Sequence, residues 1–311
     1  MSFDRQITHA SPTGAKLNLY SRRADGRARG VVQVSHGLAE HAARYAQFAD
    51  FLAARGFAAY AHDHRGHGYT TAPDAPLGRF AAQDGGDKAV ADVVAVHDLI
   101  ASEYPGLPVV AMGHSMGGMI CMNFLQAHSA RVAAGAIWNS DLTGGALARL
   151  AIAILAFERM RLGSDVPSRI LPAMTFRAWG KAIPNHKTLF DWLSHDEAVV
   201  AAYVADPLCG WDASVSMWRD LFGFILNGAD RSRYSTMRRD LPLYLVGGDE
   251  DPATMKGKAI ETLASRLKAM GFSNLQSTIY ADTRHETLNE VNRDQAMRQF
   301  ADWLDRVVPA T

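Results

Sequence analysis

The sequence has little cysteine and no long apolar run. Its two cysteines, Cys121 and Cys209, lie far apart in 311 residues and share no metal-binding spacing, so a disulfide framework is not indicated and a reducing compartment is expected. No apolar stretch is long enough for a membrane-spanning helix, and residues 1–6 contain no apolar segment of the kind that signal peptides carry. We therefore expect a cytoplasmic protein with no stable membrane insertion.

The chain also lacks an excess of charge of either sign. It carries 32 basic and 32 acidic side chains, a balance that argues against nucleic acid as a partner. Apolar residues, in contrast, make up 48% of the chain, against 21% charged residues. With 311 residues, this composition predicts a sizeable core, either in one large domain with an insertion or in two modest domains. The oligomeric state stays open.

Short apolar strands alternate with amphipathic helices through most of the chain. This alternation predicts an α/β fold, with a mostly parallel central sheet that helices cover on both faces. Residues 16–20 alternate in polarity and suit an exposed edge strand. The buried strands are expected at 31–35, 57–61, 108–112, 133–138, 241–246 and 275–280, and the helices at 44–55, 84–104, 116–126, 256–270 and 292–307.

The pattern changes between residues 143 and 236, where helical segments rich in aromatic and methionine residues dominate and no buried strand is evident. We predict an all-helical insertion over 143–236, including a helix over 187–193, between the two parts of a core made of residues 1–142 and 237–311. Its large apolar side chains could line an acyl-chain tunnel, although packing is the more common role for such residues. They are Leu147, Leu150, Ile152, Ile154, Leu155, Phe157, Trp179, Phe190, Trp192, Trp211, Trp218 and Phe222.

The stretch Gly113-His114-Ser115-Met116-Gly117 matches G-x-S-x-G, the nucleophile elbow. In this motif a serine occupies a tight strand-to-helix turn, and the glycines leave room for the neighbouring backbone. The following helix N-terminus offers unpaired N–H groups to a developing negative charge. An idle serine in a glycine-rich turn is the alternative, but the apolar strand before the motif and the helix after it favour a nucleophile.

A serine nucleophile needs a histidine base and an acid that orients the base, and with this elbow the chain order is serine, acid, histidine. His285 is the only histidine after His195, so it is the candidate base. Three carboxylates follow the strand at 241–246. We choose Asp251 as the acid, because the Gly-x-x turn before it lets its carboxylate extend back toward the histidine, and Asp249 is the rival. The oxyanion donors are expected to be the N–H groups of Met116 and of Leu38, which follows Gly37.

A competing site is the histidine-rich stretch from His62 to His67, which could suggest a metal cluster at a strand end. Gly66 stands where a metal-dependent hydrolase of the H-x-H-x-D-H type carries its aspartate, so a hydrogen-bonded turn is the preferred interpretation. We therefore expect no metal and no cofactor.

These motifs resemble those of the α/β-hydrolases, in the monoacylglycerol lipase and lysophospholipase-like branch, also labelled serine aminopeptidase S33-like. The resemblance implies an α/β-hydrolase fold in which the helical insertion over 143–236 is a cap, with a Ser115–Asp251–His285 triad and oxyanion donors at Leu38 and Met116. The aminopeptidase label would require carboxylates that hold the ammonium group of a peptide's N-terminal residue. The cap offers Asp191, Asp196, Glu197 and Asp206, but solvated charges on helix faces are the simpler interpretation of these residues. The matching stretches are 36–41 with Arg44-Tyr45, 63–68, 113–118, 248–252 and 284–290.

We therefore predict a serine hydrolase that cleaves carboxylic esters of small-molecule or lipid-like substrates, of the monoacylglycerol or lysophospholipid type, through an acyl-enzyme. Acyl transfer to an alcohol could use the same triad. A ligand-binding protein that keeps the fold without turnover is a further alternative.

Overall fold

The computed structural model describes residues 3–309. Its centre is an eight-stranded sheet with the order β1-β2-β4-β3-β5-β6-β7-β8, in which β1 pairs antiparallel with β2, β2 pairs antiparallel with β4, and every later pair is parallel. The predicted α/β-hydrolase fold is confirmed. The strands are β1 (Arg5–Ala10), β2 (Lys16–Arg22), β3 (Gly30–Ser35), β4 (Phe57–His62), β5 (Val109–His114), β6 (Ala134–Trp138), β7 (Leu243–Gly248) and β8 (Leu275–Tyr280).

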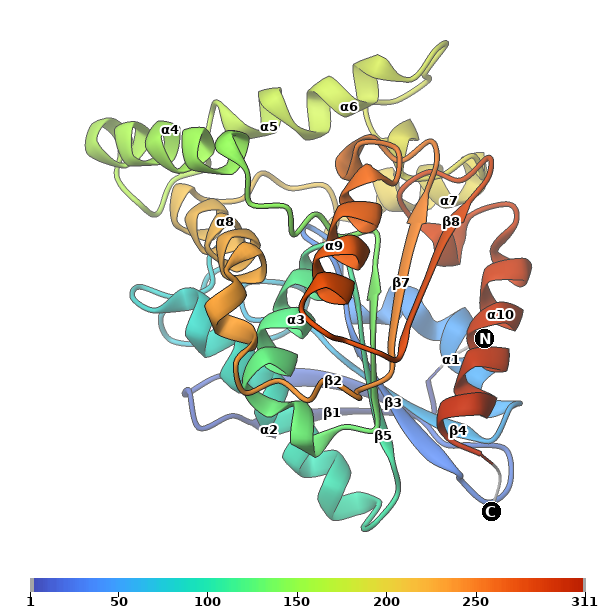
Figure 1. The fold of residues 1–311 in the computed structure, drawn as a ribbon. Helices are drawn as coiled ribbons and strands as arrows, with labels where there is room; N and C mark the ends of the chain where they lie inside the picture. Colours follow the sequence, from blue (N-terminus) through green and yellow to red (C-terminus); the bar gives the residue numbers. More distant parts are fainter. Residues whose placement is uncertain (1–2, 310–311) are drawn as a thin grey trace.

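Helices cover both faces of the sheet (Figure 1). One face packs against α1 and α10, which bury Phe48, Leu52, Phe300 and Trp303 on it. The other face packs against α2, α3 and α9. Because both faces are buried, the central strands β3 to β7 are apolar along most of their length, as parallel sheets require. These helices are α1 (Ala46–Ala53, after a 3₁₀ turn at Ala42–Tyr45), α2 (Gly85–Glu103), α3 (Met116–His128), α9 (Lys258–Ala269) and α10 (Arg293–Val307).

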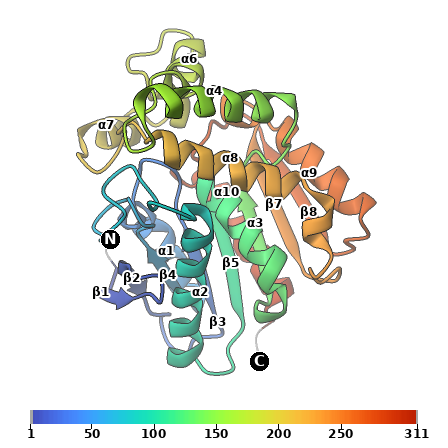
Figure 2. The same cartoon turned by 90° about the vertical axis from the view of Figure 1, so that its left-hand side faces the viewer.

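The chain between β6 and β7 forms a layer over one end of the sheet (Figure 2). Within residues 3–309 this segment holds no strand, and its only β-type pairing is an isolated bridge between Pro167 and Ser214. Residues of α8 pack into the same apolar cluster as α3, so the apolar core runs without a break from the sheet into this layer. Its helices are α4 (Ala146–Leu162), α5 (Leu171–Met174), α6 (Phe176–Ala182), α7 (Glu197–Ala205) and α8 (Val215–Ala229).

Two local expectations are wrong. Residues 16–22 form β2, which is not an exposed edge, because β1 pairs beside it and the side chains from Leu17 to Ser21 are buried. The expected helix over 187–193 is reduced to a 3₁₀ turn at Asp191–Leu193. There the Asp191 carboxylate accepts hydrogen bonds from the backbone N–H groups of Lys187 and Thr188, and these local bonds compete with helical ones.

Across residues 3–309, every helix is too short or too polar to span a lipid bilayer.

Candidate active site

Ser115 occupies a sharp turn between β5 and α3. Its backbone has φ 54° and ψ −122°, a combination rare for a residue with a side chain, and strain of this kind is typical of functional positions. The flanking glycines allow the turn: a Cβ on Gly113 would lie 2.1 Å from the carbonyl oxygen of Gly117, and one on Gly117 would lie 2.1 Å from that of Ser35. The spacing of small residues that the sequence shows is therefore a steric requirement.

The structure brings Ser115, His285 and Asp251 together from the carboxyl ends of β5, β8 and β7. The Ser115 hydroxyl lies 2.9 Å from Nε2 of His285, and Nδ1 of His285 lies 2.9 and 3.0 Å from the two carboxylate oxygens of Asp251. An ionised carboxylate can only accept, so Nδ1 carries the proton and Nε2 is free to accept from the serine. Residues 170 apart in the sequence are thus joined in one hydrogen-bonded chain.

Asp251 is fully buried, and its carboxylate accepts hydrogen bonds from four groups of the protein. Burial acts to raise its pKa, but the charge and hydrogen bond of His285, with further bonds from Asn139 and Thr254, outweigh burial and hold the pKa of Asp251 below its usual value. Asn139 donates at 3.1 Å and Thr254 at 2.9 Å. The rival Asp249 is exposed, and its carboxylate accepts only a long 3.4 Å bond from the Thr283 N–H.

Sequence reasoning missed Asn139, which follows β6 with φ 50° and accepts a 2.8 Å bond from the Thr287 hydroxyl. Its side chain therefore lies between the acid and the loop that carries the histidine. The available signal was its place directly after a buried strand, at the edge where the other site residues gather.

Leu38 and Met116 both line the pocket that contains Ser115. Met116 is the first residue of α3, so its N–H has no partner within the helix, and Leu38 lies in the loop after β3. In residues 3–309, neither N–H donates to a protein acceptor. Both are therefore free to bind an oxygen beside the serine.

An apolar pocket of about 520 Å³ opens above Ser115, between the core and the cap. Half of the twelve apolar residues considered as tunnel candidates line this pocket: Leu147, Leu150, Trp179, Trp192, Trp218 and Phe222. The other six lie outside this lining; Leu155, for example, is fully buried in the apolar core. A larger depression of about 860 Å³ between α2 and α8 has a more polar lining and contains none of the three hydrogen-bonded residues.

The acidic residues of the cap do not line this pocket. Asp191 caps a turn, Asp196 caps α7, Glu197 pairs with Lys187 and Asp206 pairs with His41. None of them is placed to hold the ammonium group of a peptide substrate.

The histidines from 62 to 67 are buried, and their nitrogen atoms do not converge on one point. His62 and His64 have ring centroids 4.7 Å apart, and among residues 3–309 no nitrogen of either ring has a hydrogen-bond partner. Burial lowers the pKa of His62 and of His67 to about 4, so both rings are neutral at pH 7. The preferred interpretation is a hydrogen-bonded turn, and the backbone does turn here, with the His67 N–H donating to the His64 carbonyl at 3.0 Å. Among the described residues, Nε2 of His67 has no hydrogen-bond partner.

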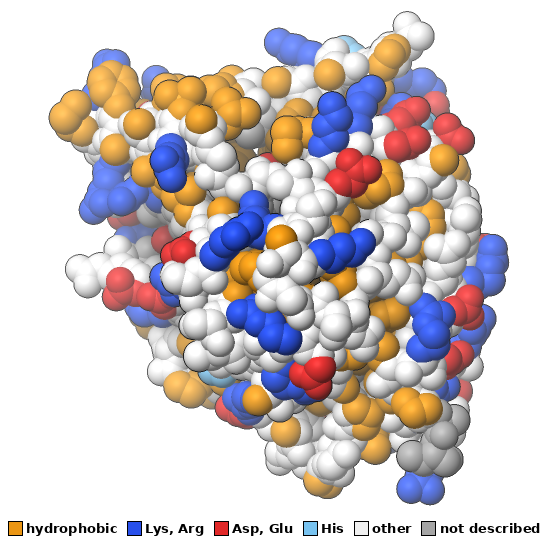
Figure 3. All heavy atoms as spheres, viewed as in Figure 1, with side chains coloured by type: hydrophobic (Ala, Val, Ile, Leu, Met, Phe, Trp, Pro, Cys, Tyr) orange, Lys and Arg blue, Asp and Glu red, His pale blue; other side chains and the backbone are white. Residues whose placement is uncertain are grey.

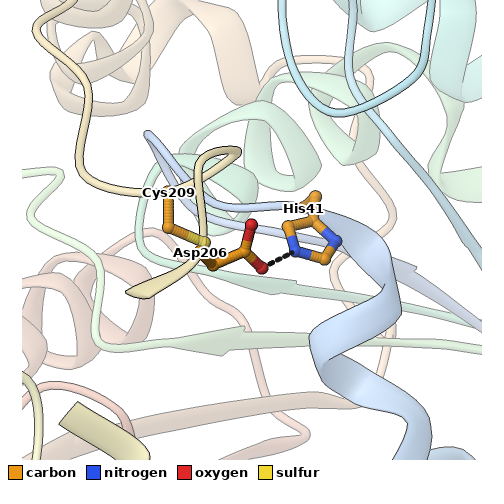
Figure 4. A group of neighbouring side chains, drawn as sticks. All are labelled: His41, Asp206 and Cys209. Carbon is orange, nitrogen blue, oxygen red and sulfur yellow. Dashed lines mark hydrogen bonds and ion pairs between the residues drawn. The ribbon is translucent and has the colours of Figure 1, made fainter. Parts of the chain in front are cut away.

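In residues 3–309 one group of three side chains has its ligand-type atoms within 4.8 Å of one another: His41, Asp206 and Cys209 (Figure 4). Nε2 of His41 lies 2.8 Å from the Asp206 carboxylate, which is a hydrogen bond between the loop after β3 and the segment after α7. Burial raises the pKa of the Cys209 thiol, and the neighbouring Arg44 cation opposes a second positive charge there. The donor set fits a hydrogen-bonded tether better than a metal site.

The sheet order, the insertion after β6 and the serine at the strand-to-helix turn together define an enzyme of the α/β-hydrolase class. The family model described as serine aminopeptidase, S33, matches residues 26–292. The match covers most of the sequence, and the chain belongs to this family.

The chain aligns with curated relatives over nearly its whole length. The chain is 29% identical over 282 residues to a monoacylglycerol lipase of Mycolicibacterium smegmatis, covering 89% of this chain and 88% of the relative. It is 28% identical over 291 residues to the monoglyceride lipase of Mus musculus, covering 93% and 86%. The protein is therefore a carboxylic-ester hydrolase.

Solved structures share the fold. A carboxyl esterase from Bacillus coagulans superposes with a TM-score of 0.86 at 21% identity, covering 99% of both chains. A lipase in its open form superposes with a TM-score of 0.83 at 25% identity, covering 98% of this chain and 99% of the other.

Proposed function

We propose that this hydrolase cleaves esters of the monoacylglycerol or lysophospholipid type with Ser115 as nucleophile, His285 as base and Asp251 as the orienting acid. The observation that carries the proposal is the hydrogen-bonded chain Ser115–His285–Asp251, whose Ser115 and His285 line an apolar pocket. The base lies 2.9 Å from the nucleophile and 2.9 to 3.0 Å from the acid, in the order that acyl transfer needs, and this geometry supports the chemistry.

The reaction has two steps. Nε2 of His285 takes the serine proton while Oγ bonds to the ester carbonyl carbon, and Asp251 stabilises the imidazolium. The N–H groups of Leu38 and Met116 bind the oxyanion. The C–O bond to the alcohol then breaks as His285 returns the proton to that alcohol. A water molecule, deprotonated by His285, next attacks the acyl carbon, the bond from that carbon to Oγ breaks, and the fatty acid leaves as His285 returns the proton to Ser115. No cofactor takes part.

The pocket supports an apolar acyl chain as the part of the substrate that is recognised. Its lining is mainly apolar and its volume of about 520 Å³ lies in the range of small-molecule sites. Beside it α4 exposes Leu147, Leu150, Phe157 and Met160, and Figure 3 shows hydrophobic side chains gathered at the α4 end of the cap. The monoacylglycerol lipase names of the relatives agree with this substrate class.

The test is a panel of p-nitrophenyl esters and monoacylglycerols of graded chain length, measured on the wild type, Ser115→Ala and His285→Ala. We expect hydrolysis that depends on chain length, and a loss in kcat of at least about 10³-fold in both variants with folding intact. Ser235→Ala, which removes an exposed serine outside the pocket, serves as the control. A loss below tenfold in His285→Ala would identify another base.

Three further measurements separate the alternatives. Intact-mass analysis after rapid quenching should find one acyl group on the wild type and none on Ser115→Ala. Product ratios in water–alcohol mixtures reveal acyl transfer if ester products dominate at low alcohol content. A folded protein that neither turns over the panel nor reacts with an organophosphonate would be a binding protein.

A further inference from the structure

A buried ion cluster lies behind the catalytic residues and is centred on Arg44. One guanidinium nitrogen, Nη1, donates to Glu40 at 2.5 Å and to Glu286 at 2.6 Å, and Nη2 donates to the second oxygen of Glu286 at 2.7 Å. The three side chains are 12%, 4% and 4% exposed. The planar guanidinium group, which donates in fixed directions, sets the distance between the two carboxylates, whereas the compact ammonium group of a lysine would not.

Each carboxylate is attached to a different part of the proposed machinery. Glu40 accepts the Gly37 N–H at 2.5 Å, and Gly37 directly precedes Leu38, the proposed oxyanion donor. Glu286 directly follows His285, the proposed base. Arg44 therefore joins the loop that presents the oxyanion donor to the loop that presents the base, over 242 residues of sequence.

The space around Glu40 is too small for either loop to shift freely. A Cβ on Gly37 would lie 2.7 Å from Oε1 of Glu40 and 3.3 Å from Cβ of Ser115. Oε1 also accepts the Tyr45 hydroxyl at 3.0 Å. A displacement of Glu40 therefore moves the backbone beside the serine.

The cap reaches the same cluster. The Arg44 guanidinium lies 4.9 Å from the ring of Tyr203 on α7, within cation–π distance. The Tyr203 hydroxyl donates at 2.8 Å to the carbonyl of Ala39, and the Gly210 N–H donates to the same oxygen at 2.9 Å. Ala39 follows Leu38 and has φ 55°, a conformation that these two bonds hold in place.

The charges of the cluster favour a cation at its centre. Burial acts to lower the pKa of Arg44, but Glu286 and Glu40 outweigh it and raise the pKa well above its usual value. His114 faces Glu40 with Nδ1 at 3.5 Å, while its Nε2–H donates to the backbone carbonyl of His285 at 2.9 Å. Without Arg44, two buried carboxylates would face each other with at most His114 to neutralise them.

We propose that Arg44 is a positioning residue that fixes the Leu38 N–H and the His285 imidazole relative to Ser115. This inference rests on the proposed function, because it assigns a role to the arrangement of that triad and oxyanion hole. Arg44 itself touches neither the ester nor the reacting atoms.

The test compares Arg44→Lys with the wild type on p-nitrophenyl acetate, an ester too short to depend on the acyl pocket. Active sites are counted by stoichiometric organophosphonate labelling, and folding is checked by circular dichroism and thermal melting. We expect kcat per labelled site to fall about 10- to 100-fold while KM changes less than about threefold, because a small misplacement of reacting groups lowers the rate without weakening ground-state binding. The rate of phosphonylation should fall by a similar factor, since it also needs the oxyanion donors.

Arg293→Lys is the matched control. Arg293 also joins a core loop to the cap, with Asp196 at 3.0 Å and the Glu290 carbonyl at 2.8 Å, but it contacts neither Glu40 nor Glu286. Its kcat should stay within about threefold of the wild type. If Arg44→Lys does not fold, Glu286→Gln, which keeps the shape of the side chain, carries the test with the same criteria and an expected loss of about tenfold.

If folded Arg44→Lys has the same kcat per labelled site as the wild type, the inference is overturned. A loss of activity that matches the loss of labelled sites would also overturn it, because that result means a structural role alone. The proposed function fails separately, if Ser115→Ala retains turnover.

Discussion

The pocket has two walls of different construction. The core wall consists of loop residues at the carboxyl ends of the strands, among them Leu38, Ser115, Met116 and His285, and is held by buried hydrogen bonds and ion pairs. The cap wall consists of apolar side chains from α4 to α8, among them Ala151, Trp218 and Leu221. Hydrogen bonds and ion pairs fix direction and distance, whereas apolar contacts tolerate changes of shape. The core wall is therefore suited to chemistry and the cap wall to the choice of substrate.

The largest effect should follow from changing the acid of the core wall. Asp251→Asn keeps the shape but offers an amide to His285 and favours the wrong tautomer, so kcat should fall by about 10³- to 10⁴-fold. Asp249→Asn is the matched control and should stay within about threefold, because Asp249 is exposed. The measurement is kcat for p-nitrophenyl butyrate, with melting curves for both variants. A larger loss of kcat in Asp249→Asn than in Asp251→Asn would identify Asp249 as the acid.

Lowering the pH should reduce the stability of the folded protein, because its core contains buried histidines that resist protonation. In the folded protein the pKa values of His62 and His67 are about 4, below the unfolded value of about 6.5, so the unfolded chain binds more protons between these pH values. Stability should be fully present above pH 6.5 and fall as the pH drops toward 4, by up to about 3 kcal/mol per histidine.

Urea unfolding at pH 7, 6 and 5 measures this slope. His62→Phe removes a ring whose nitrogens have no hydrogen-bond partner in the described part of the chain, so it should fold and show a shallower slope. An unchanged slope in that variant would show that other groups control the acid response.

A change in the cap wall should alter selectivity with little effect on the chemistry. Ala151→Phe inserts a ring into the pocket and should lower kcat/KM for long-chain monoacylglycerols by about 10- to 30-fold, while hydrolysis of p-nitrophenyl acetate stays within about threefold. Ala156→Phe places the same ring on an exposed position of α4 and is the control. Equal losses on short and long esters would mean that the two walls do not act separately.

The sequence allowed much of the core wall to be predicted because the elbow and the chain order are local patterns. The glycines around Ser115 and the single histidine after residue 195 sufficed to name the three side chains that the structure brings together. Whether they act as a triad, and whether the cap begins and ends at residues 143 and 236, stays a prediction. Acyl transfer stays an alternative.

Other features depend on contacts between distant segments, and no local pattern shows them. Asn139 meets Asp251 across 112 residues, and Arg44 meets Glu286 across 242. The burial of β2 was missed because β1, its neighbour, is largely exposed and polar and gave no strand signal. The cap residues that line the pocket could not be separated from those that only pack, because both are apolar at helical spacing.

The unbroken apolar cluster between α8 and α3 bears on protein engineering. Trp218, Leu221, Phe224 and Ile225 of α8 belong to the same cluster as Met119 and Ile120 of α3. A chimera that takes its substrate preference from another hydrolase should therefore exchange the segment from α4 to α7 and keep α8 as part of the scaffold. Deletion of the whole insertion would expose the apolar residues of α3 that α8 covers to water, and we expect the shortened protein to aggregate.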